Sequence, residues 1–280
     1  MRFGIYLPSV NRFADPGALV EIACAAEESG WDGVFLWDHV AWTTGEGPAR
    51  IADTWVTLGA MASRTGRVRI GPLVTPAARR RPQKLAREAV SVDRLSGGRL
   101  TLGVGLGSPA EEEFGAFGEE ADARIRAQRL DEGLELVRSL WSGGPVEFEG
   151  VHHRASTSGF VPGPVQSPRI PIWVAGSAKP RPIARAARWD GMFPMSSGWP
   201  EKEYGAAEYA SIRRRIEGLR GDDGGGFDLV HASVSRPLPE AEEVAEMGAA
   251  GVTWWLSSFF VDGSPEDAMA LASVRPPRAE

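Results

Sequence analysis

Short apolar runs alternate with helix-like segments along almost the whole chain. The first run, RFGIYLPS, is followed by DPGALVEIACAAEESG, in which Asp15 is suited to cap a helix, Pro16 to begin it and Gly30 to end it. The same unit recurs, with further helices predicted over about 53–65, 82–96 and 124–141. In the second half, IPIWVAG, DGMFPM, FDLVHASV and GVTWWLSSFF each precede a helical pattern. The sequence therefore predicts about eight strand-and-helix pairs.

The strand-like runs are apolar throughout, which is typical of parallel sheets covered by helices on both faces. The chain has 280 residues, the size of a (β/α)8 barrel with modest insertions. We therefore predict an α/β fold, a single TIM-barrel domain over residues 1–280. An insertion rich in Gly and Pro, GPVEFEGVHHRASTSGFVPGPVQSPR, is expected between the fourth helix and the fifth strand, with room for a hairpin.

A doubly wound dinucleotide-binding sheet is the main alternative, because it is also built from strand–helix–strand units. The stretch LGVGLGSP has glycines at positions 103, 105 and 107, but Ser108 stands where the dinucleotide-binding pattern has its third glycine. That pattern also belongs after the first strand of such a sheet, and this stretch follows the fourth. We therefore favour the barrel.

Composition narrows the range of partners and sites. A formal net charge of −6, without a long basic block, gives no general attraction to nucleic acid. MRFGIYLPSV has no signal-peptide pattern and no apolar stretch reaches the length of a membrane span, so we expect a cytoplasmic protein with no membrane partner. Cys24 is the single cysteine, which excludes a cysteine-based metal site within one chain, and no metal motif occurs. The expected partner is a small molecule.

The second predicted strand lies in GVFLWDHVAW and ends in Asp38 and His39. In a (β/α)8 barrel the active site lies at the C-terminal ends of the strands, so these residues fall on the catalytic face. Because an imidazole can gain or lose a proton near neutral pH, we predict that His39, oriented by Asp38, is the catalytic acid or base. Trp42 follows as a wall of the substrate pocket. The alternative is that Asp38 only caps the start of a solvated loop.

The ends of the fourth and sixth strands also have features suited to a ligand. Gly105, Gly107 and Ser108 have small side chains or none, so a flat ring could approach the backbone there. Crowding inside the barrel could demand the same glycines. Trp199 follows the sixth strand in FPMSSGW and is predicted to cover the pocket or to stack on a ligand.

A turn and a run of arginines are two candidates for binding an anion. The fifth strand ends in AGSAKP, where Gly176, Ser177 and Ala178 lead into a helix with free N–H groups and a favourable dipole, although a plain tight turn is the alternative. The run Arg79-Arg80-Arg81 follows the third strand and could hold an anionic tail, although charge runs are usually only solvated.

Several of these stretches together resemble the bacterial luciferase-like superfamily. They are SGGRLTLGVGLG, the Asp38-His39 pair, LVTPAARRRPQKLAREAVSVDRLSGGR and PIWVAGSAKPRPIARAARWDGMFP, and the resemblance is clearest over roughly residues 1–200. Members of the superfamily include flavin monooxygenases and oxidoreductases that use the deazaflavin coenzyme F-420. The resemblance implies a (β/α)8 barrel that binds the flavin-type ring at its mouth, and a homodimer.

The resemblance also implies roles for particular residues. Leu73-Val74 falls where the family often has a non-prolyl cis peptide that supports the ring, with Thr75 beside it. His39 matches a histidine near the reactive face of the ring, and the ribityl phosphate is expected at Gly176, Ser177 and Ala178. Ser108 is a departure, because some members that oxidise sugar phosphates or alcohols have an acidic residue there.

We therefore predict a luciferase-like flavin-dependent oxidoreductase or monooxygenase that uses FMN or coenzyme F-420 on a small, mostly apolar organic substrate. A non-catalytic flavin-binding homologue is the first alternative. A hydrolase or an aldolase on the same barrel is the second, but the strand ends have neither a metal cluster or carboxylate pair nor a suitable lysine.

Overall fold

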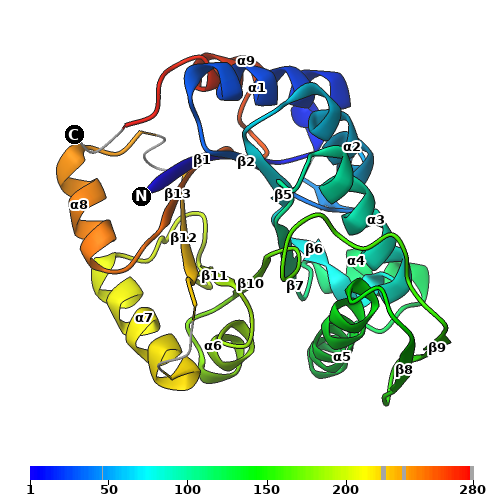
Figure 1. The fold of residues 1–280 in the computed structure, drawn as a ribbon. Helices are drawn as coiled ribbons and strands as arrows, with labels where there is room; N and C mark the ends of the chain where they lie inside the picture. Colours follow the sequence, from blue (N-terminus) through cyan, green and yellow to red (C-terminus); the bar gives the residue numbers. More distant parts are fainter. Residues whose placement is uncertain (46, 222–224, 235–237, 278–280) are drawn as a thin grey trace.

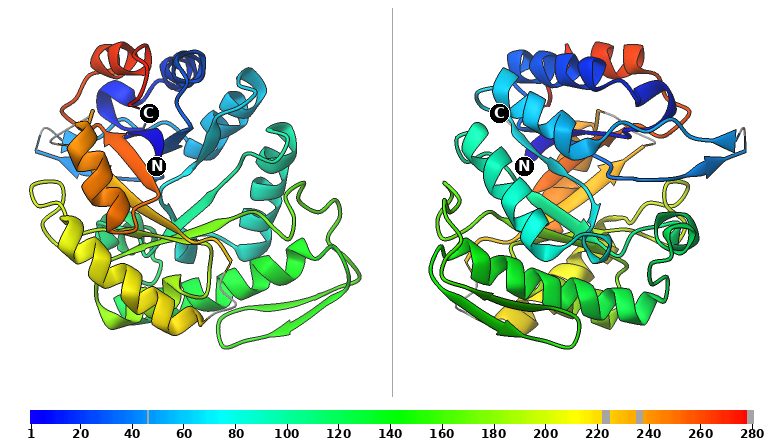
Figure 2. Two further views of the ribbon diagram at one scale, coloured as in Figure 1. Left: turned by 60° about the vertical axis from the view of Figure 1, so that its left-hand side comes forward. Right: turned by 90° about the vertical axis from the view of Figure 1, so that its right-hand side faces the viewer.

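Parallel strands form a nearly closed barrel, and helices form a layer around it (Figures 1 and 2). The structure is a computed structural model that describes residues 1–45, 47–221, 225–234 and 238–277. The predicted TIM-barrel architecture is confirmed, and the alternative of an open dinucleotide-binding sheet is wrong. None of the helices in the described ranges is long and apolar enough to cross a membrane.

The barrel strands pair in an order that runs around the sheet: β5 (Arg69–Pro72), β2 (Gly33–Leu36), β1 (Arg2–Leu7), β13 (Trp254–Ser258), β12 (Asp228–Ser233), β11 (Gly191–Pro194), β10 (Ile172–Gly176), β7 (Leu102–Gly105) and β6 (Thr75–Pro76). The covering helices are α1 (Pro16–Ser29), α2 (Thr54–Arg64), α3 (Pro82–Leu95), α5 (Ala123–Trp141), α6 (Pro180–Ala186), α7 (Ala206–Arg220), α8 (Ala241–Ala249) and α9 (Pro265–Ala272).

The caps predicted for the first helix are confirmed. The Asp15 side chain accepts a hydrogen bond of 2.9 Å from the Gly17 N–H, and Pro16 is the first residue of α1. Gly30 ends α1 with φ of 95°, a left-handed conformation that favours glycine. These local signals place the helix correctly because they act within one turn.

The third barrel strand is split into two pieces, and this split closes the barrel. β5 pairs with β2 on one side, and β6, only two residues further along the chain, pairs with β7 on the other. A parallel bridge between Ile70 and Leu100 adds a contact between the two sides of the seam. Strands β5 and β6 therefore form one stave of the barrel, the third, which pairs with β2 at its start and with β7, the fourth stave, at its end.

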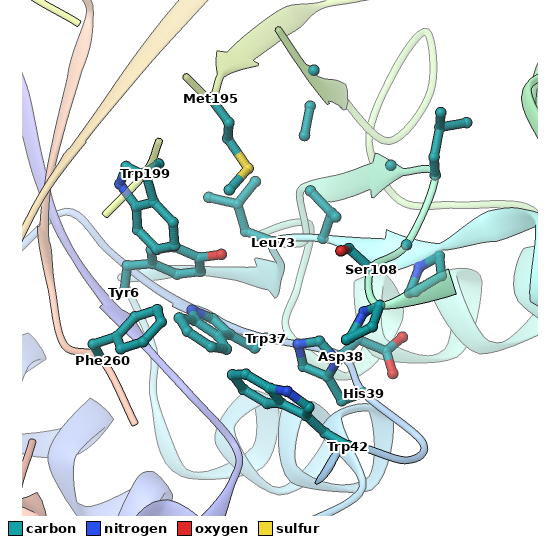
Figure 3. Close-up of a pocket in the computed structure, with 18 residues that line it drawn as sticks. Tyr6, Trp37, Asp38, His39, Trp42, Leu73, Ser108, Met195, Trp199 and Phe260 are labelled. Carbon is teal, nitrogen blue, oxygen red and sulfur yellow. The ribbon is translucent and has the colours of Figure 1, made fainter. Parts of the chain in front are cut away.

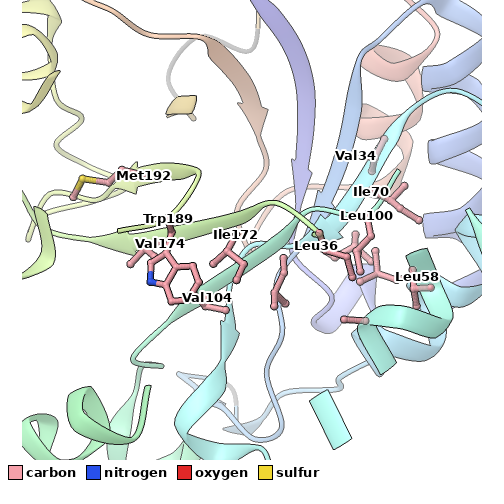
Figure 4. Packing of buried hydrophobic residues seen from close by; sticks show 14 of the residues in the cluster. Val34, Leu36, Leu58, Ile70, Leu100, Val104, Ile172, Val174, Trp189 and Met192 are labelled. Atoms are coloured by element: carbon pink, nitrogen blue, oxygen red, sulfur yellow. The ribbon is translucent and has the colours of Figure 1, made fainter. Parts of the chain in front are cut away.

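The barrel strands are buried on both faces, as their continuous apolar sequences predict. On β2, Phe35 points into the barrel, where its ring lies 5.1 Å from that of Trp173. Val34 and Leu36 belong to the core between sheet and helices, beside Leu58 of α2 (Figure 4). Each strand thus contributes to two cores, so a polar residue at its end is held on rigid structure.

The predicted insertion forms a hairpin of β8 (Val146–Glu149) and β9 (Arg154–Thr157), which packs outside α5 (Figure 1). His152 and His153 lie in its turn, where the Glu132 carboxylate accepts hydrogen bonds from their backbone N–H groups. A second, smaller hairpin, β3 (Thr43–Thr44) with β4 (Gly47–Pro48), follows the end of β2.

The SGGR segment joins α3 to β7 and also ends α2. Gly97 and Gly98 have φ of 66° and 91°. This turn brings the Arg99 guanidinium to the carbonyl oxygens of Ala62 and Thr65, at 3.1 and 2.7 Å. Arg99 therefore satisfies carbonyl groups at the C-terminal end of α2 that have no partner within that helix.

His231 lies on the helix-facing side of β12. Its Nδ1 is 3.1 Å from the Tyr209 hydroxyl of α7, and its ring packs 4.4 Å from that of Trp255. Burial lowers the pKa of His231 to about 4, and the nearby Glu203 carboxylate opposes this shift. The imidazole is therefore neutral in the folded protein at neutral pH.

We expect His231 to make the fold less stable in mild acid. In the unfolded chain His231 binds a proton below a pKa of about 6.5. In the folded chain it binds that proton only near pH 4. The free energy of unfolding should therefore fall from pH 7 to pH 5 by on the order of 1 kcal/mol more in the wild type than in His231→Gln. Urea titrations at the two pH values measure this difference, and parallel pH dependences would contradict it.

Candidate active site

A pocket of about 410 Å³ opens at the C-terminal ends of the barrel strands (Figure 3). Its volume lies within the range of small-molecule sites. Residues from several strand ends and the following loops line it: Tyr6, Trp37, Asp38, His39, Trp42, Leu73, Val74, Pro76, Gly105, Leu106, Gly107, Ser108, Pro109, Ala175, Gly176, Met195, Trp199 and Phe260. The pocket therefore brings together most of the residues that the sequence singled out.

Aromatic rings form one side of the pocket (Figure 3). Trp37 is central, with ring centroids 6.0 Å from Trp42, 6.1 Å from Trp199 and 5.3 Å from Phe260. Tyr6 continues this wall, and burial raises the pKa of its hydroxyl. Trp42 and Trp199 thus lie where the sequence predicted, whereas Tyr6, Trp37 and Phe260 were not assigned to the pocket from the sequence, although each lies at or near a strand end.

Leu73 and Val74 join β5 to β6 and also line the pocket. The peptide bond between them is cis, as the family resemblance implied. Thr75 follows, fully buried, and donates a hydrogen bond of 2.7 Å to the Asp38 carboxylate. Thr75 therefore supports the site from behind the wall and does not line the pocket itself.

Gly105 and Gly107 are required by crowding between the third and fourth staves. A Cβ at Gly105 would lie 2.7 Å from Val74 Cγ2, and one at Gly107 would lie 2.8 Å from Pro76 Cβ. Gly107 also has φ of 81°. Crowding therefore accounts for both glycines, and the same close approach leaves their backbone, with that of Ser108, on the pocket wall.

Arg126 of α5 fixes the loop after β7. Its guanidinium donates to the carbonyl oxygens of Leu106 and Gly107, at 2.6 and 2.8 Å, and lies 4.9 Å from the ring centroid of Phe114. Burial lowers the pKa of this guanidinium. The side chain holds a wall of the pocket without facing the pocket.

The Asp38 carboxylate is buried and paired beneath the pocket. Arg80 donates to it at 2.8 Å and Arg79 at 3.3 Å, while Thr75 of β6 and the indole N–H of Trp55 on α2 also donate to it. Asp38 is therefore neither a loop cap nor the residue that orients His39, because its oxygens are bonded to this set. It anchors the end of β2 instead.

The His39 ring is oriented by Glu113, which corrects the predicted pairing with Asp38. Its Nδ1 lies 2.9 Å from Glu113 Oε1, and the same oxygen accepts the Val40 N–H at 3.1 Å. Glu113 is the last residue of the one-turn helix α4 (Ala110–Glu113). The sequence offered only a weak signal for it, three successive glutamates whose directions a short helix decides.

Two of the three arginines in the run form ion pairs within the protein. Arg79 pairs with Asp38 and Glu113, and Arg80 pairs with Asp38 and Glu88. The side chains of Arg79 and Arg80 are only 12% and 16% exposed. Only Arg81 of the three is exposed, at the start of α3, so the run does not offer three free charges to an anionic tail.

The turn after β10 lies at the far edge of the pocket. Gly176 lines the pocket, and a Cβ there would meet Pro182 Cβ at 2.8 Å. The Ala178 N–H donates to the Tyr204 hydroxyl at 3.3 Å, and Arg215 donates to the Ala178 carbonyl at 2.8 Å. Ser177 lies beside them, half-buried. Of the three residues expected to bind an anion, the structure places only Gly176 on the pocket wall.

Comparison with known proteins points to one family. The sequence model of the luciferase-like monooxygenase family matches residues 1–270. An F-420-dependent glucose-6-phosphate dehydrogenase from Gordonia bronchialis is 39% identical over 164 residues, 58% of this chain and 47% of that protein. One from Nakamurella multipartita is 36% identical over 203 residues, 71% of this chain and 58% of that protein. This chain therefore spans about half the length of these curated relatives.

Solved structures share the architecture. The coenzyme F-420-dependent tetrahydromethanopterin reductase from Methanopyrus kandleri is similar with a TM-score of 0.75, covering 98% of each chain at 16% identity. An F-420-dependent secondary alcohol dehydrogenase in complex with an F-420-acetone adduct has a TM-score of 0.75, covering 97% of this chain and 98% of that one at 19% identity. At such identities the likeness establishes the barrel fold alone.

Asp38→Asn should destabilise the fold because it leaves the Arg79 and Arg80 guanidinium groups short of a buried counter-charge. We expect a loss of about 2–4 kcal/mol in the free energy of unfolding, measured by urea denaturation at pH 7. Asp262→Asn, at an exposed position, is the control and should change stability little. Equal stability of the two variants would contradict the role given to Asp38.

Proposed function

The chain belongs to the luciferase-like monooxygenase family, and we propose that it is an oxidoreductase that uses coenzyme F-420 or FMN on a small, uncharged, mostly apolar organic substrate. The observation that carries the proposal is the pocket at the strand ends, which combines an aromatic wall, the cis-linked Leu73-Val74 pair and one histidine. The relatives named above as F-420-dependent support the first of the two cofactors.

The pocket residues fit a flat, largely apolar ring. Leu73 and Val74 offer aliphatic surface on one side, and the indoles of Trp37 and Trp42 offer aromatic surface on another. The backbone at Gly105 and Gly107 carries no side chain that would keep a ring away. Such a slot, apolar with few polar groups, is typical of cofactor sites.

A cofactor phosphate is proposed to lie toward Gly176 and Ser177. The turn leads into α6, and cationic side chains lie next to it: Lys179 follows at an exposed position, and Arg215 is bonded to the Ala178 carbonyl. The Ala178 N–H is already bonded to Tyr204, so that hydroxyl would have to share or yield its position. Arg81 is the one residue of the arginine run left exposed for an anionic tail.

His39 is proposed to move a proton at the reacting centre. When bound, the flavin-type ring supplies two-electron oxidation or reduction in the pocket. Oxidation of a hydroxyl group to a carbonyl group releases a proton, and the reverse reaction consumes one, so a histidine on the pocket wall assists either direction. Trp42 stacks on the His39 ring at 5.2 Å with an interplanar angle of 26°, which limits the ring's rotation.

The lining of the pocket indicates the substrate class. Among the described residues that line it, none is a lysine or an arginine, and its polar side chains are chiefly Asp38, His39 and Ser108. A sugar phosphate would bring a dianion that has no counter-charge there, at a considerable cost in desolvation. Ser108, at the position where some members have an acidic residue, agrees with a different substrate. We therefore propose a neutral apolar alcohol or carbonyl compound.

The two alternatives lack support in the described part of the chain. A metal-dependent hydrolase is disfavoured because no group of three or more potential metal ligands was found there. An aldolase of the Schiff-base type needs a lysine, and the described lining has none. A non-catalytic binder of the same ring is separated from an enzyme by turnover.

Titration with each cofactor tests the proposal. We expect coenzyme F-420 or FMN to quench the protein's tryptophan fluorescence with a Kd in the micromolar range, roughly −8 kcal/mol of binding free energy. Riboflavin, which has the FMN ring without the phosphate, is the matched control for the Gly176 turn and should bind more weakly than FMN. Absence of binding by both cofactors would overturn the proposed function.

The substrate class is tested with the cofactor-loaded protein. We expect kcat/KM for neutral secondary alcohols or ketones to exceed that for glucose 6-phosphate by about 100-fold or more, because the pocket wall offers the phosphate no cation. Trp199→Ala should lower kcat/KM for the apolar substrates by about 10-fold and leave the low activity on the sugar phosphate unchanged. Preference for glucose 6-phosphate would contradict the substrate class.

A further inference from the structure

We propose that Glu113 is the positioning residue of His39: its carboxylate holds the imidazole proton on Nδ1 and leaves Nε2 as the atom that exchanges a proton in the pocket. The inference deepens the proposed function and rests on it for the role of the proton transfer. The tautomer and the ring orientation are properties of the protein alone.

Glu113 is placed to hold the ring. Its side chain is completely buried, and Oε1 lies 2.9 Å from His39 Nδ1. The same oxygen accepts a hydrogen bond from the backbone N–H of Val40 at 3.1 Å, so the carboxylate binds both the ring and the adjacent backbone. Glu113 therefore holds both the imidazole ring of His39 and the backbone immediately after it.

Arg79 determines which atom carries the proton. Its Nε lies 3.1 Å from Glu113 Oε2, and the Val40 N–H donates to the other oxygen. A carboxylate that forms an ion pair with a guanidinium and accepts a backbone N–H has no proton to give. The His39 nitrogen that faces it must therefore be the donor, which places the proton on Nδ1.

The opposite side of the ring is left for the ligand. His39 lines the pocket, and within the described residues Nε2 has no hydrogen-bond partner. In the neutral imidazole with Nδ1 protonated, Nε2 is an acceptor. The stacking of Trp42 on the ring keeps it in this plane. The arrangement thus prepares a general base whose geometry does not depend on the ligand.

The helix α4 explains why Glu113 and not its neighbours holds the ring. Glu112 accepts the Thr43 backbone N–H, and Glu111 is exposed. Phe114, buried at 1% exposure, anchors the end of α4, where Arg126 packs on its ring. Glu113 is therefore carried by a fixed turn, and Glu111 offers a matched control on the same helix.

Nitrogen-15 NMR of the protein without cofactor at neutral pH tests the inference. The signals of the His39 ring are identified among the four histidines by their loss in His39→Ala. We expect wild-type His39 to be the Nδ1–H tautomer, and Glu111→Gln to leave it unchanged. Glu113→Gln should give a mixed population, because the amide NH2 group must face either the Arg79 guanidinium or the His39 ring and the Val40 N–H. A wild-type spectrum dominated by the Nε2–H tautomer, or an unchanged tautomer in Glu113→Gln, overturns the inference.

Kinetics of the loaded enzyme supply the second measurement. Glu113→Gln should lower kcat by about 10–100-fold with little change in KM or in cofactor Kd, an effect of the size found for hydrogen-bond partners of metal-bound histidines. Loss of cofactor binding together with kcat would instead indicate a merely structural role. If Glu113→Gln fails to fold, the wild-type tautomer alone decides. Failure of both cofactors to bind would overturn the proposed function without touching the tautomer.

Discussion

The close approach of the third and fourth staves is the constraint on which the rest of the structure depends. Glycines make it possible: a Cβ at Gly71 would lie 2.0 Å from the Thr101 carbonyl oxygen, and one at Gly103 would lie 2.3 Å from that of Pro72. Because these two staves touch at the backbone, β5 can pair with β2 while β6 pairs with β7, and the sheet closes on itself. The same contact places Leu73, Val74 and the bare backbone of Gly105 on the pocket wall. Barrel closure and the shape of the site therefore have one cause.

Beneath the pocket, buried charges are arranged in compensating pairs. Two carboxylates, Asp38 and Glu113, face two guanidinium groups, Arg79 and Arg80, and Arg79 touches both acids. Desolvating such groups is expensive, so each must be paired and hydrogen-bonded to be tolerated. The pairs connect the end of β2, the segment after β6 and α4 in one network. Loss of any member would alter the position of the His39 ring, which extends from this network into the pocket.

The pocket shares its location with the sites of other barrels but has its own lining. In this architecture the strand ends supply position and the loops supply chemistry. Here the loops contribute indoles, a phenylalanine and a methionine, and the described lining contains no cationic side chain. The curated relatives are longer proteins that this chain matches over about half their length. The proposed substrate class rests on these loop residues, because they line the pocket.

The sequence by itself determined the order of strands and helices, the caps of α1, the hairpin insertion and the residues at the strand ends. These features depend on the spacing of apolar residues and on capping residues, which act between positions close together in the sequence. It also pointed, through the family resemblance, to the cis peptide at Leu73-Val74. Only the tertiary structure decided which acid meets which base. Glu113 is 74 positions from His39, and a one-turn helix determines which of three glutamates points inward. From the sequence, Arg79 and Arg80 could be free positive charges. In the structure they form ion pairs with Asp38 and Glu113, because a buried charge must be paired.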